Sequence, residues 1–212
     1  MSKLALRKTR STAFIKMALV LLLGVAAGAG LFVATLRSGP APQLAAQDSS
    51  SALTGLLDQQ AQSFDAASLH GRYTLLYFGF TFCPDACPTA LSNLSLALRQ
   101  LDPDAMRIQP IFVSVDPARD TPAQLAEYLT HFSQHIVGLT GSSVAMQTVA
   151  QRFGVIAFEH RDEGLPGGYT MDHSNEFLLL SPEGRLLVRL PANQTADELL
   201  EQLSGLTRST DT

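Results

Sequence analysis

The stretch LLYFGFTFCPDACPTALSN, residues Leu75–Asn93, decides the fold and contains the only two cysteines of the chain. Its first residues are apolar and aromatic β-formers, and its last residues are helix formers at helical spacing. This pattern predicts a buried strand that leads directly into a helix. Cys83 and Cys87 lie at the junction, where backbone N–H groups and the positive end of the helix favour a thiolate over a thiol. The stretch therefore predicts a site for redox exchange or for a soft metal.

The spacing of the two cysteines fits both kinds of chemistry. Cys83 and Cys87 are four residues apart, so a helical turn would place their side chains on one face. This spacing is one residue longer than the C-x-x-C of dithiol oxidoreductases. It permits a disulfide, and it also leaves room for an ion, since thiolates prefer soft or borderline metals such as Cu(I) and Zn. Two unrelated buried thiols are the less favoured interpretation, because Pro84 and Pro88 flank this lone pair at a strand-to-helix turn.

A third ligand would be needed for a stable metal site, and His173 is the strongest candidate among five histidines and five methionines. It lies in YTMDHS, residues Tyr169–Ser174, just before the predicted strand Glu176–Leu180 and after a glycine-rich loop. A histidine packed at the end of a loop is an equal alternative. Met171 would share a face with His173 in an extended segment, and a packed methionine is favoured there over a thioether ligand. The remaining histidines are interpreted as solvated or surface residues: His70, His131, His135 and His160.

Charge is divided unevenly along the 212 residues. Six basic residues precede residue 40, and the first acidic residue is Asp48. After residue 40, nine basic residues stand against all 19 acidic ones, which gives a net charge of −10. Such an acidic domain argues against nucleic acid as a partner, because phosphate binding needs the opposite charge. It would instead help to attract a basic protein or a cation.

The N-terminal part of the chain predicts a membrane anchor. Residues 1–16 form a basic segment, and the next 20 residues, Met17–Leu36, are uncharged. As a helix they would span about 30 Å, the thickness of a hydrocarbon core. A cleaved signal peptide usually has an apolar stretch of only about 7–15 residues, so a retained anchor is favoured, although the small residues Ala26–Gly30 leave cleavage open. Five positive charges before the span against one after it predict a cytoplasmic N-terminus and an exported domain.

Residues 37–52 predict a flexible tether, residues 53–206 one globular domain, and residues 207–212 a tail. Inside the domain strands alternate with helices, and a weak hairpin precedes them. This predicts an α/β layered sheet with flanking helices, mostly parallel with antiparallel edges. The expected strands are Thr74–Phe80, Ile108–Val115, Ile136–Leu139, Val155–Phe158, Glu176–Leu180 and Leu186–Leu190. The expected helices are Pro88–Leu101, one capped by Thr121, one from Ser142 or Ser143 to Phe153, and Thr195–Leu206.

The acidic segment DPARDTP, Asp116–Pro122, follows a predicted strand. Acidic residues at a strand end can be catalytic, but turn chemistry followed by a helix cap is the favoured interpretation, with Arg119 pairing locally. The chain has no G-x-S-x-G, no glycine-rich phosphate loop and no H-E-x-x-H, so the usual hydrolase and nucleotide-binding functions have no support.

Five segments in order, YFGFTFCPDACP, VSVDPARDTP, VGLTG, YTMDHS and SPEGR, resemble the Sco/SenC family of copper-binding assembly factors for cytochrome c oxidase. The resemblance covers about residues 53–206 and implies a thioredoxin-like fold on a single N-terminal membrane anchor. It implies that Cys83, Cys87 and His173 are copper ligands, and that the cysteine pair also cycles between dithiol and disulfide. It further implies a role in maturing the dinuclear copper centre of oxidase subunit two, by metal delivery, by reduction of that subunit's cysteines, or both.

Two functions therefore remain open from the sequence, a metallochaperone and, as the alternative, a thiol–disulfide oxidoreductase acting on an exported partner. The expected location is the inner (cytoplasmic) membrane, crossed once, with the N-terminus inside and the domain facing the periplasm. One residue departs from the family pattern, which usually has histidine directly before the first cysteine, where this chain has Phe82. The expected ligands are intact, but the change removes a polar neighbour of the thiol and could alter its redox potential.

Overall fold

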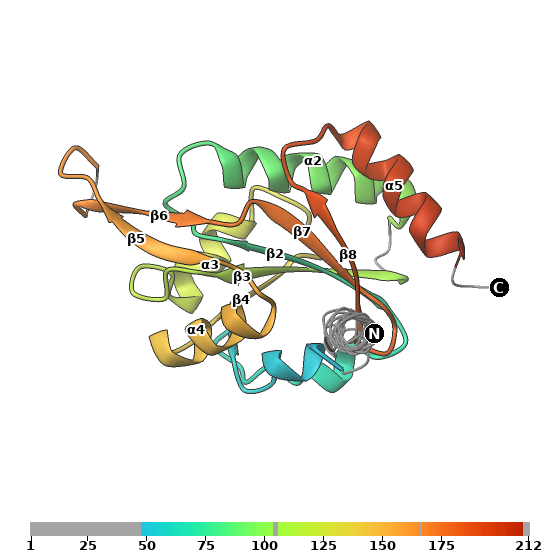
Figure 1. Cartoon of the computed structure of the whole chain (residues 1–212), viewed down its shortest axis with the longest axis horizontal. Helices are drawn as coiled ribbons and strands as arrows, with labels where there is room; N and C mark the ends of the chain where they lie inside the picture. The colour runs from blue at the N-terminus through green and yellow to red at the C-terminus, as the bar shows by residue number, and fades with distance from the viewer. Residues whose placement is uncertain (1–47, 104–105, 166, 210–212) are drawn as a thin grey trace, which may run out of the picture. The chain divides into compact units, whose positions relative to one another are not determined.

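A central strand, β2 (Tyr73–Gly79), is buried along its whole length and organises the sheet in this computed structural model. The structure describes residues 48–103, 106–165 and 167–209. The six-stranded sheet has the order β1-β4-β3-β2-β7-β8 (Figure 1). Its other strands are β1 (Leu57–Asp58), β3 (Ile108–Ser114), β4 (Val137–Thr140), β7 (Glu176–Leu180) and β8 (Leu186–Pro191).

The prediction of a mostly parallel sheet is wrong. Only the pairs β2–β3 and β3–β4 are parallel, whereas β1–β4, β2–β7 and β7–β8 are antiparallel. The β7–β8 hairpin is one of the expected antiparallel edges, since a short turn can only join antiparallel neighbours. The departure is at the centre, where β7 pairs antiparallel with β2, and within the described residues no helix stands between β6 and β7 to carry the chain back along the sheet. The weak N-terminal hairpin is present and short: Leu57 and Ser63 form an isolated antiparallel bridge, and the N–H of Phe64 donates to the carbonyl oxygen of Leu56 at 2.7 Å.

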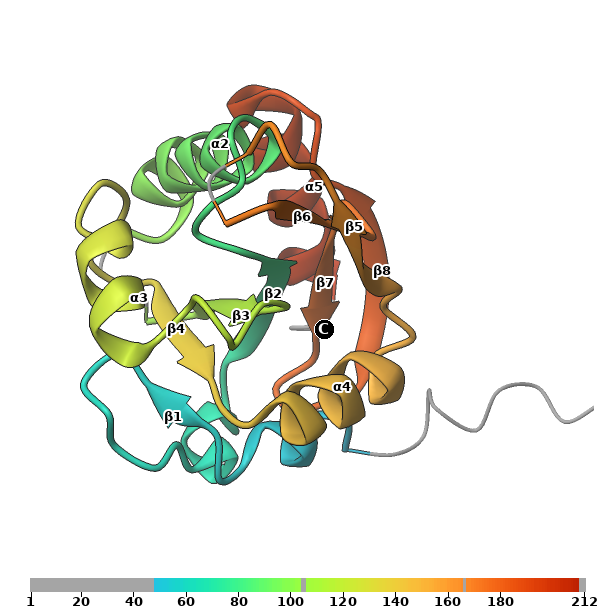
Figure 2. The ribbon, with the colours of Figure 1, turned by 90° about the vertical axis from the view of Figure 1, so that its left-hand side faces the viewer.

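Helices cover both faces of the sheet. Figure 2 shows α2 (Ala86–Leu101), α3 (Pro122–Leu129) and α5 (Ala196–Ser209) on one face and α4 (Ser143–Arg152) on the other. The expected caps of α3 and α4 are present. Thr121 Oγ1 accepts from the N–H of Gln124 at 3.2 Å, and Ser142 Oγ accepts from the N–H of Ala145 at 3.2 Å.

Neighbouring aromatic residues of β2 point to opposite faces, as the pleat of a strand requires. The Tyr77 ring packs towards α2 and α3, with its centroid 6.2 Å from that of Phe112, which in turn lies 5.8 Å from Tyr128 of α3. The Phe78 ring lies on the other face, 5.8 Å from Phe153 at the end of α4. The core is therefore two apolar layers separated by a sheet that is buried on both sides.

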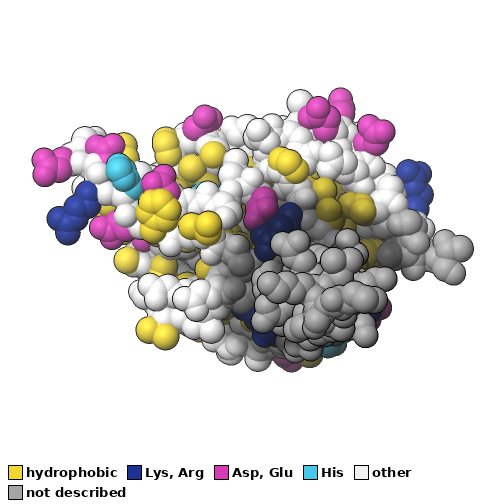
Figure 3. All heavy atoms as spheres, viewed as in Figure 1, with side chains coloured by type: hydrophobic (Ala, Val, Ile, Leu, Met, Phe, Trp, Pro, Cys, Tyr) yellow, Lys and Arg dark blue, Asp and Glu magenta, His cyan; other side chains and the backbone are white. Residues whose placement is uncertain are grey.

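A second, two-stranded sheet follows α4 and consists of β5 (Ala157–Arg161) and β6 (Tyr169–His173), paired antiparallel. The sequence predicts a strand at Val155–Phe158, which the structure has two residues later, and does not predict β6. The mixed polar segment YTMDH lacks the alternation or apolar run that would mark a strand. Charged side chains of both signs gather on this hairpin (Figure 3), where Arg161, Asp162 and Glu163 are exposed.

The predicted basic segment 1–16, the anchor 17–36 and residues 37–47 of the tether lie outside the described residues. Within the part that is described, no helix has the length and apolar character needed to cross a bilayer. The last helix, α5, ends at Ser209 rather than at the predicted Leu206.

Gly79, the last residue of β2, is a sensitive point of this fold. A Cβ at this position would lie 2.9 Å from the sulfur of Cys87 and 2.9 Å from a ring carbon of Phe112. We expect Gly79→Ala to lower the free energy of unfolding by about 1–3 kcal/mol, the usual cost of overpacking a core. Urea unfolding followed by circular dichroism measures this change.

Gly205→Ala is the matched control, because a Cβ there meets nothing within 4 Å and Gly205 lies in α5. That change should raise the stability by about 0.5–1 kcal/mol, since alanine is the better helix former. Equal effects of the two substitutions would contradict the close approach at Gly79.

Candidate functional site

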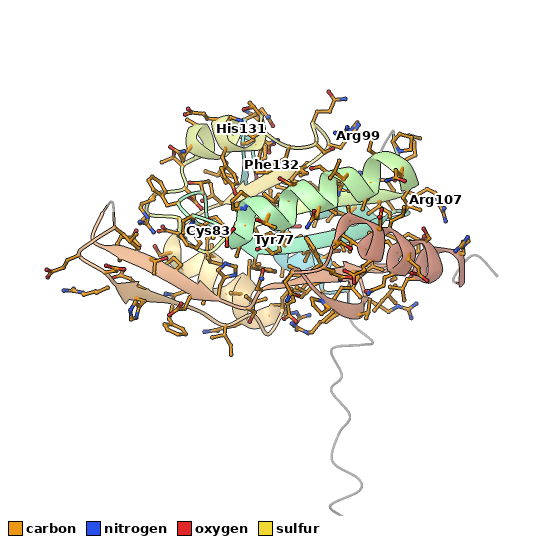
Figure 4. The ribbon with its side chains drawn as sticks, turned by 90° about the horizontal axis from the view of Figure 1, so that it is seen from above. Tyr77, Cys83, Arg99, Arg107, His131 and Phe132 are labelled. Carbon is orange, nitrogen blue, oxygen red and sulfur yellow. The ribbon has the colours of Figure 1, made fainter. Side chains whose placement is uncertain are left out.

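The two cysteines lie where β2 gives way to α2. The helix begins at Ala86, two residues earlier than the predicted Pro88, so Cys87 is in its first turn and Cys83 precedes it. Cys87 is fully buried, whereas Cys83 is partly exposed. The N–H of Cys87 donates to the sulfur of Cys83 at 3.3 Å, so this sulfur accepts one of the unpaired donors of the helix N-terminus. Figure 4 shows Cys83 at this end of α2, with Tyr77 on the strand beside it.

The end of β6 brings His173 to the same place. Its Nε2 lies 3.6 Å from the sulfur of Cys87, although the two residues are 86 positions apart. Its Nδ1 lies 3.0 Å from the carbonyl oxygen of Ser174, so a proton on Nδ1 leaves the lone pair of Nε2 directed at the sulfur. The rings of Phe80 and Tyr77 meet the imidazole edge-on, at centroid distances of 5.9 and 6.2 Å. The structure thus brings together the three predicted site residues, and aromatic side chains fix the imidazole.

The two thiols have opposite acidities. The hydrogen bond from the Cys87 side chain lowers the pKa of Cys83 to about 4, helped by the His173 ring and by the N–H groups of Cys87 and Asp85, against the effect of burial. The pKa of Cys87 is raised, first by that same hydrogen bond to Cys83 and then by burial and by the negative charge of Cys83. At neutral pH the pair is therefore one partly exposed thiolate, Cys83, and one buried thiol, Cys87.

A polar pair that the sequence does not predict lies beside the Cys87 sulfur, formed by buried Tyr77 and exposed Asn175. The hydroxyl of Tyr77 donates to Oδ1 of Asn175 at 2.9 Å. Burial, followed by the proximity of Cys87, raises the pKa of Tyr77, so its proton stays in place. The sequence does carry one signal for this hydrogen bond, a tyrosine inside a strand predicted to be buried, because a buried phenol needs a hydrogen-bond partner. Asn175 could not have been chosen as that partner without the sheet register.

The segment Asp116–Pro122 forms a turn followed by a helix cap, which is the interpretation that the sequence favours. Arg119 pairs with Asp116 three residues before it, and Thr121 caps α3. Asp120 accepts hydrogen bonds from the N–H of Thr81, at 3.2 Å, and from the hydroxyls of Thr81 and Ser114, both at 2.7 Å. Burial raises the pKa of Asp120, while these hydrogen bonds oppose the shift. The segment thus anchors the backbone two residues before Cys83.

The other candidate ligands lie elsewhere. His131 and His135 follow the end of α3, and Figure 4 shows His131 well apart from Cys83. His70 lies 3.2 Å from a carboxylate oxygen of Asp48. His160 is exposed on β5, and Met171 packs against the hydrophobic core, as expected for a strand methionine.

Two cysteine sulfurs and one imidazole nitrogen are donors that suit a soft metal ion, although they do not already form a complete coordination site. Among the described residues, no three His, Cys, Asp or Glu side chains already form a metal-binding group. Metal–sulfur distances near 2.3 Å and metal–nitrogen distances near 2.1 Å place two such ligands of one ion about 3.6–3.8 Å apart. The 3.6 Å between Cys87 and His173 agrees with this separation. The Cys83 sulfur interacts with both of these groups, the Cys87 side chain and the His173 ring.

The chain is similar to known proteins both in sequence and in structure. The sequence profile of the SCO1/SenC family matches residues 46–208. "Protein SCO2, mitochondrial" from Saccharomyces cerevisiae is 40% identical over 149 residues, which are 70% of this chain but only 50% of the yeast protein. "SCO2-like protein" from Rickettsia felis is 35% identical over 150 residues, 71% of this chain and 73% of that protein.

Among solved structures, Bradyrhizobium japonicum ScoI with copper bound is 38% identical and has a TM-score of 0.64, covering 70% of this chain and 94% of the ScoI chain. Yeast Sco1 with copper bound is 35% identical and has a TM-score of 0.66, covering 73% of this chain and 86% of the Sco1 chain. These likenesses confirm the predicted thioredoxin-like α/β fold.

The unequal thiols predict a distinctive pH profile of alkylation. Because the pKa of Cys83 is about 4, its reaction with iodoacetamide should keep a constant rate from about pH 8 down to about pH 5 and fall only below that. An ordinary thiol, with a pKa near 8.5, would slow about tenfold per pH unit over that range. Mass spectrometry of the modified peptides should place the adduct on Cys83. A rate that drops from pH 8 downward, or early modification of Cys87, would contradict the assignment.

Proposed function

Because the chain belongs to the SCO1/SenC family, we propose that it is a copper metallochaperone that carries its ion on Cys83, Cys87 and His173. The single observation that supports this most strongly is the 3.6 Å approach of His173 Nε2 to the sulfur of Cys87, from distant parts of the chain. A dithiol that only exchanges disulfides has no need of an imidazole at that place. Two thiolates and a neutral imidazole are also donors that suit Cu(I).

The partial exposure of Cys83 supports a cargo role rather than a permanent site. Cys87 is buried and His173 packs against the Phe80 and Tyr77 rings, whereas Cys83 is partly exposed. An ion held by three protein ligands keeps one open side, from which thiolates of a partner could attack. In such a transfer each partner thiolate replaces one of the three ligands, and the ion keeps its charge throughout.

The expected partner is subunit two of cytochrome c oxidase, whose dinuclear copper centre would receive the ion. The expected arrangement places residues 1–16 in the cytoplasm, residues 17–36 across the inner membrane, residues 37–52 as a tether, residues 53–206 as the copper-binding domain in the periplasm, and residues 207–212 as a tail. The sequence supports this arrangement through the uncharged 20-residue span and the excess of positive charge before it.

A thiol–disulfide oxidoreductase is the second candidate, and the acidities of the thiols support it. The Cys83 thiolate would attack a disulfide of the partner, forming a mixed disulfide and releasing one partner thiolate. Cys87 would then lose its proton and attack the Cys83 sulfur, which releases the second partner thiolate and leaves a Cys83–Cys87 disulfide. The partner gains two electrons and this chain loses two. Cys83 is the attacking thiol because its pKa is low and it is the more exposed of the pair.

Copper titration tests the ligand set. The full-length reduced chain, titrated with Cu(I) against a chromophoric chelator, should bind one equivalent. Cys83→Ser and Cys87→Ser should lose this binding, and His173→Ala should weaken it roughly tenfold or more, which corresponds to about 1.4 kcal/mol. His160→Ala is the matched control, because His160 is an exposed histidine of the neighbouring strand. Wild-type affinity in His173→Ala would remove that residue from the site.

The same variants separate the two candidate functions. If copper delivery is the function, His173→Ala should still reduce a model disulfide but should fail to support oxidase assembly in cells. Cys83→Ser should fail in both assays. An oxidase fully assembled by His173→Ala, despite lost copper retention, would favour the oxidoreductase over the chaperone.

A further inference from the structure

Arg119 lies between the loop that carries the cysteines and the hairpin that carries His173. Its side chain is only 13% exposed and pairs with Asp116. The guanidinium carbon lies 3.7 Å from the ring centroid of Tyr169 and 4.8 Å from that of Phe82. A cation within about 6 Å of a ring centroid is attracted to the face of the ring. Arg119 thus contacts one aromatic side chain from each of the two segments.

On the hairpin side the contact involves the backbone as well as the ring. Nη1 of Arg119 donates to the carbonyl oxygen of Tyr169 at 3.1 Å, and the Tyr169 hydroxyl donates to Oδ1 of Asp116 at 2.9 Å. Gly167, with φ at +88°, passes so close that a Cβ there would lie 3.4 Å from Nη1. Tyr169 begins β6 and His173 ends it, so the position of this strand also determines where the imidazole lies.

On the cysteine side the contact is made by Phe82, which directly precedes Cys83. Phe82 is 44% exposed. The guanidinium also lies 5.9 Å from the ring of Phe80, two residues earlier. Arg119 therefore contacts the rings of both Phe80 and Phe82, which lie on either side of Thr81 in the chain. Thr81 in turn donates a hydrogen bond from its hydroxyl to Asp120.

We propose that Arg119 is a positioning residue that, stacked between Phe82 and Tyr169, sets the separation between the cysteine loop and the His173 hairpin. This rests on the copper-binding function proposed above, because the separation matters when the three ligands must reach one ion. The contacts themselves join protein groups only. In this chain Phe82 has a definite role, since it gives the guanidinium a ring to stack on at the edge of the cysteine loop.

The shape of the guanidinium distinguishes this role from simple charge pairing. A planar guanidinium can stack on aromatic rings while its N–H groups pair with a carboxylate and a carbonyl, whereas an ammonium is a compact point charge. Arg119→Lys would keep the positive charge beside Asp116 and lose the stacking. Phe82→Leu would keep an apolar side chain and lose the aromatic face.

The test uses these two variants in the full-length chain with two measurements. Amide hydrogen exchange of the copper-free protein should become faster in β5 and β6 and stay unchanged in β2 and β3. Release of Cu(I) to an excess of chelator should become roughly 2- to 30-fold faster, the range that the loss of such a stacking contact implies. Phe82→Tyr, which retains an aromatic face, should show wild-type values in both measurements.

Arg161→Lys and Phe158→Leu are the matched controls, because both residues are exposed on β5 of the same hairpin. Neither should change copper release. Unchanged exchange in β5 and β6 of both test variants would overturn the proposal, and so would an equal rise in β2 and β3, which would indicate general destabilisation. Should the wild type bind no copper, the proposed function fails, while the exchange measurement still decides whether Arg119 positions the hairpin.

Discussion

Because Gly79 has no side chain, the sulfur of Cys87 packs closely against the end of β2. A Cβ on residue 79 would lie only 2.9 Å from that sulfur. This close approach fixes the first turn of α2 against the central strand. The two parallel strands β2 and β3 end at the same edge of the sheet, and β7 begins there because it runs antiparallel to β2. The cysteine loop, the segment after Ser114 and the end of β6 therefore meet at one place, as ligand-binding segments do at the carboxyl edge of such sheets.

The chemistry of the site follows from the unequal surroundings of two identical side chains. Cys83 precedes the helix and accepts from its first turn, so it carries the negative charge. Cys87 is buried against β2 and keeps its proton. A metal ion would replace that proton, since thiols bind metals as thiolates. The Tyr77 hydroxyl, held by Asn175, gives the buried sulfur a polar neighbour in an otherwise apolar core.

The sequence predicts the β2–α2 unit well because its signals are local: an apolar run, turn residues, then helical periodicity. The caps at Thr121 and Ser142 are confirmed for the same reason. The antiparallel position of β7 and the strand β6 could not be predicted, because both depend on pairing between distant segments. For Arg119 the sequence predicts only that it pairs locally. Its contacts with Phe82 and Tyr169 join segments that are remote in the chain.

The central claim is that two sulfurs and one imidazole nitrogen bind a single copper ion. X-ray absorption at the copper edge of the full-length chain, loaded with one equivalent of Cu(I), tests it most directly. We expect two sulfur neighbours and one nitrogen neighbour, with the outer-shell scattering typical of an imidazole ring. A spectrum with sulfur neighbours alone and no imidazole scattering would contradict the account.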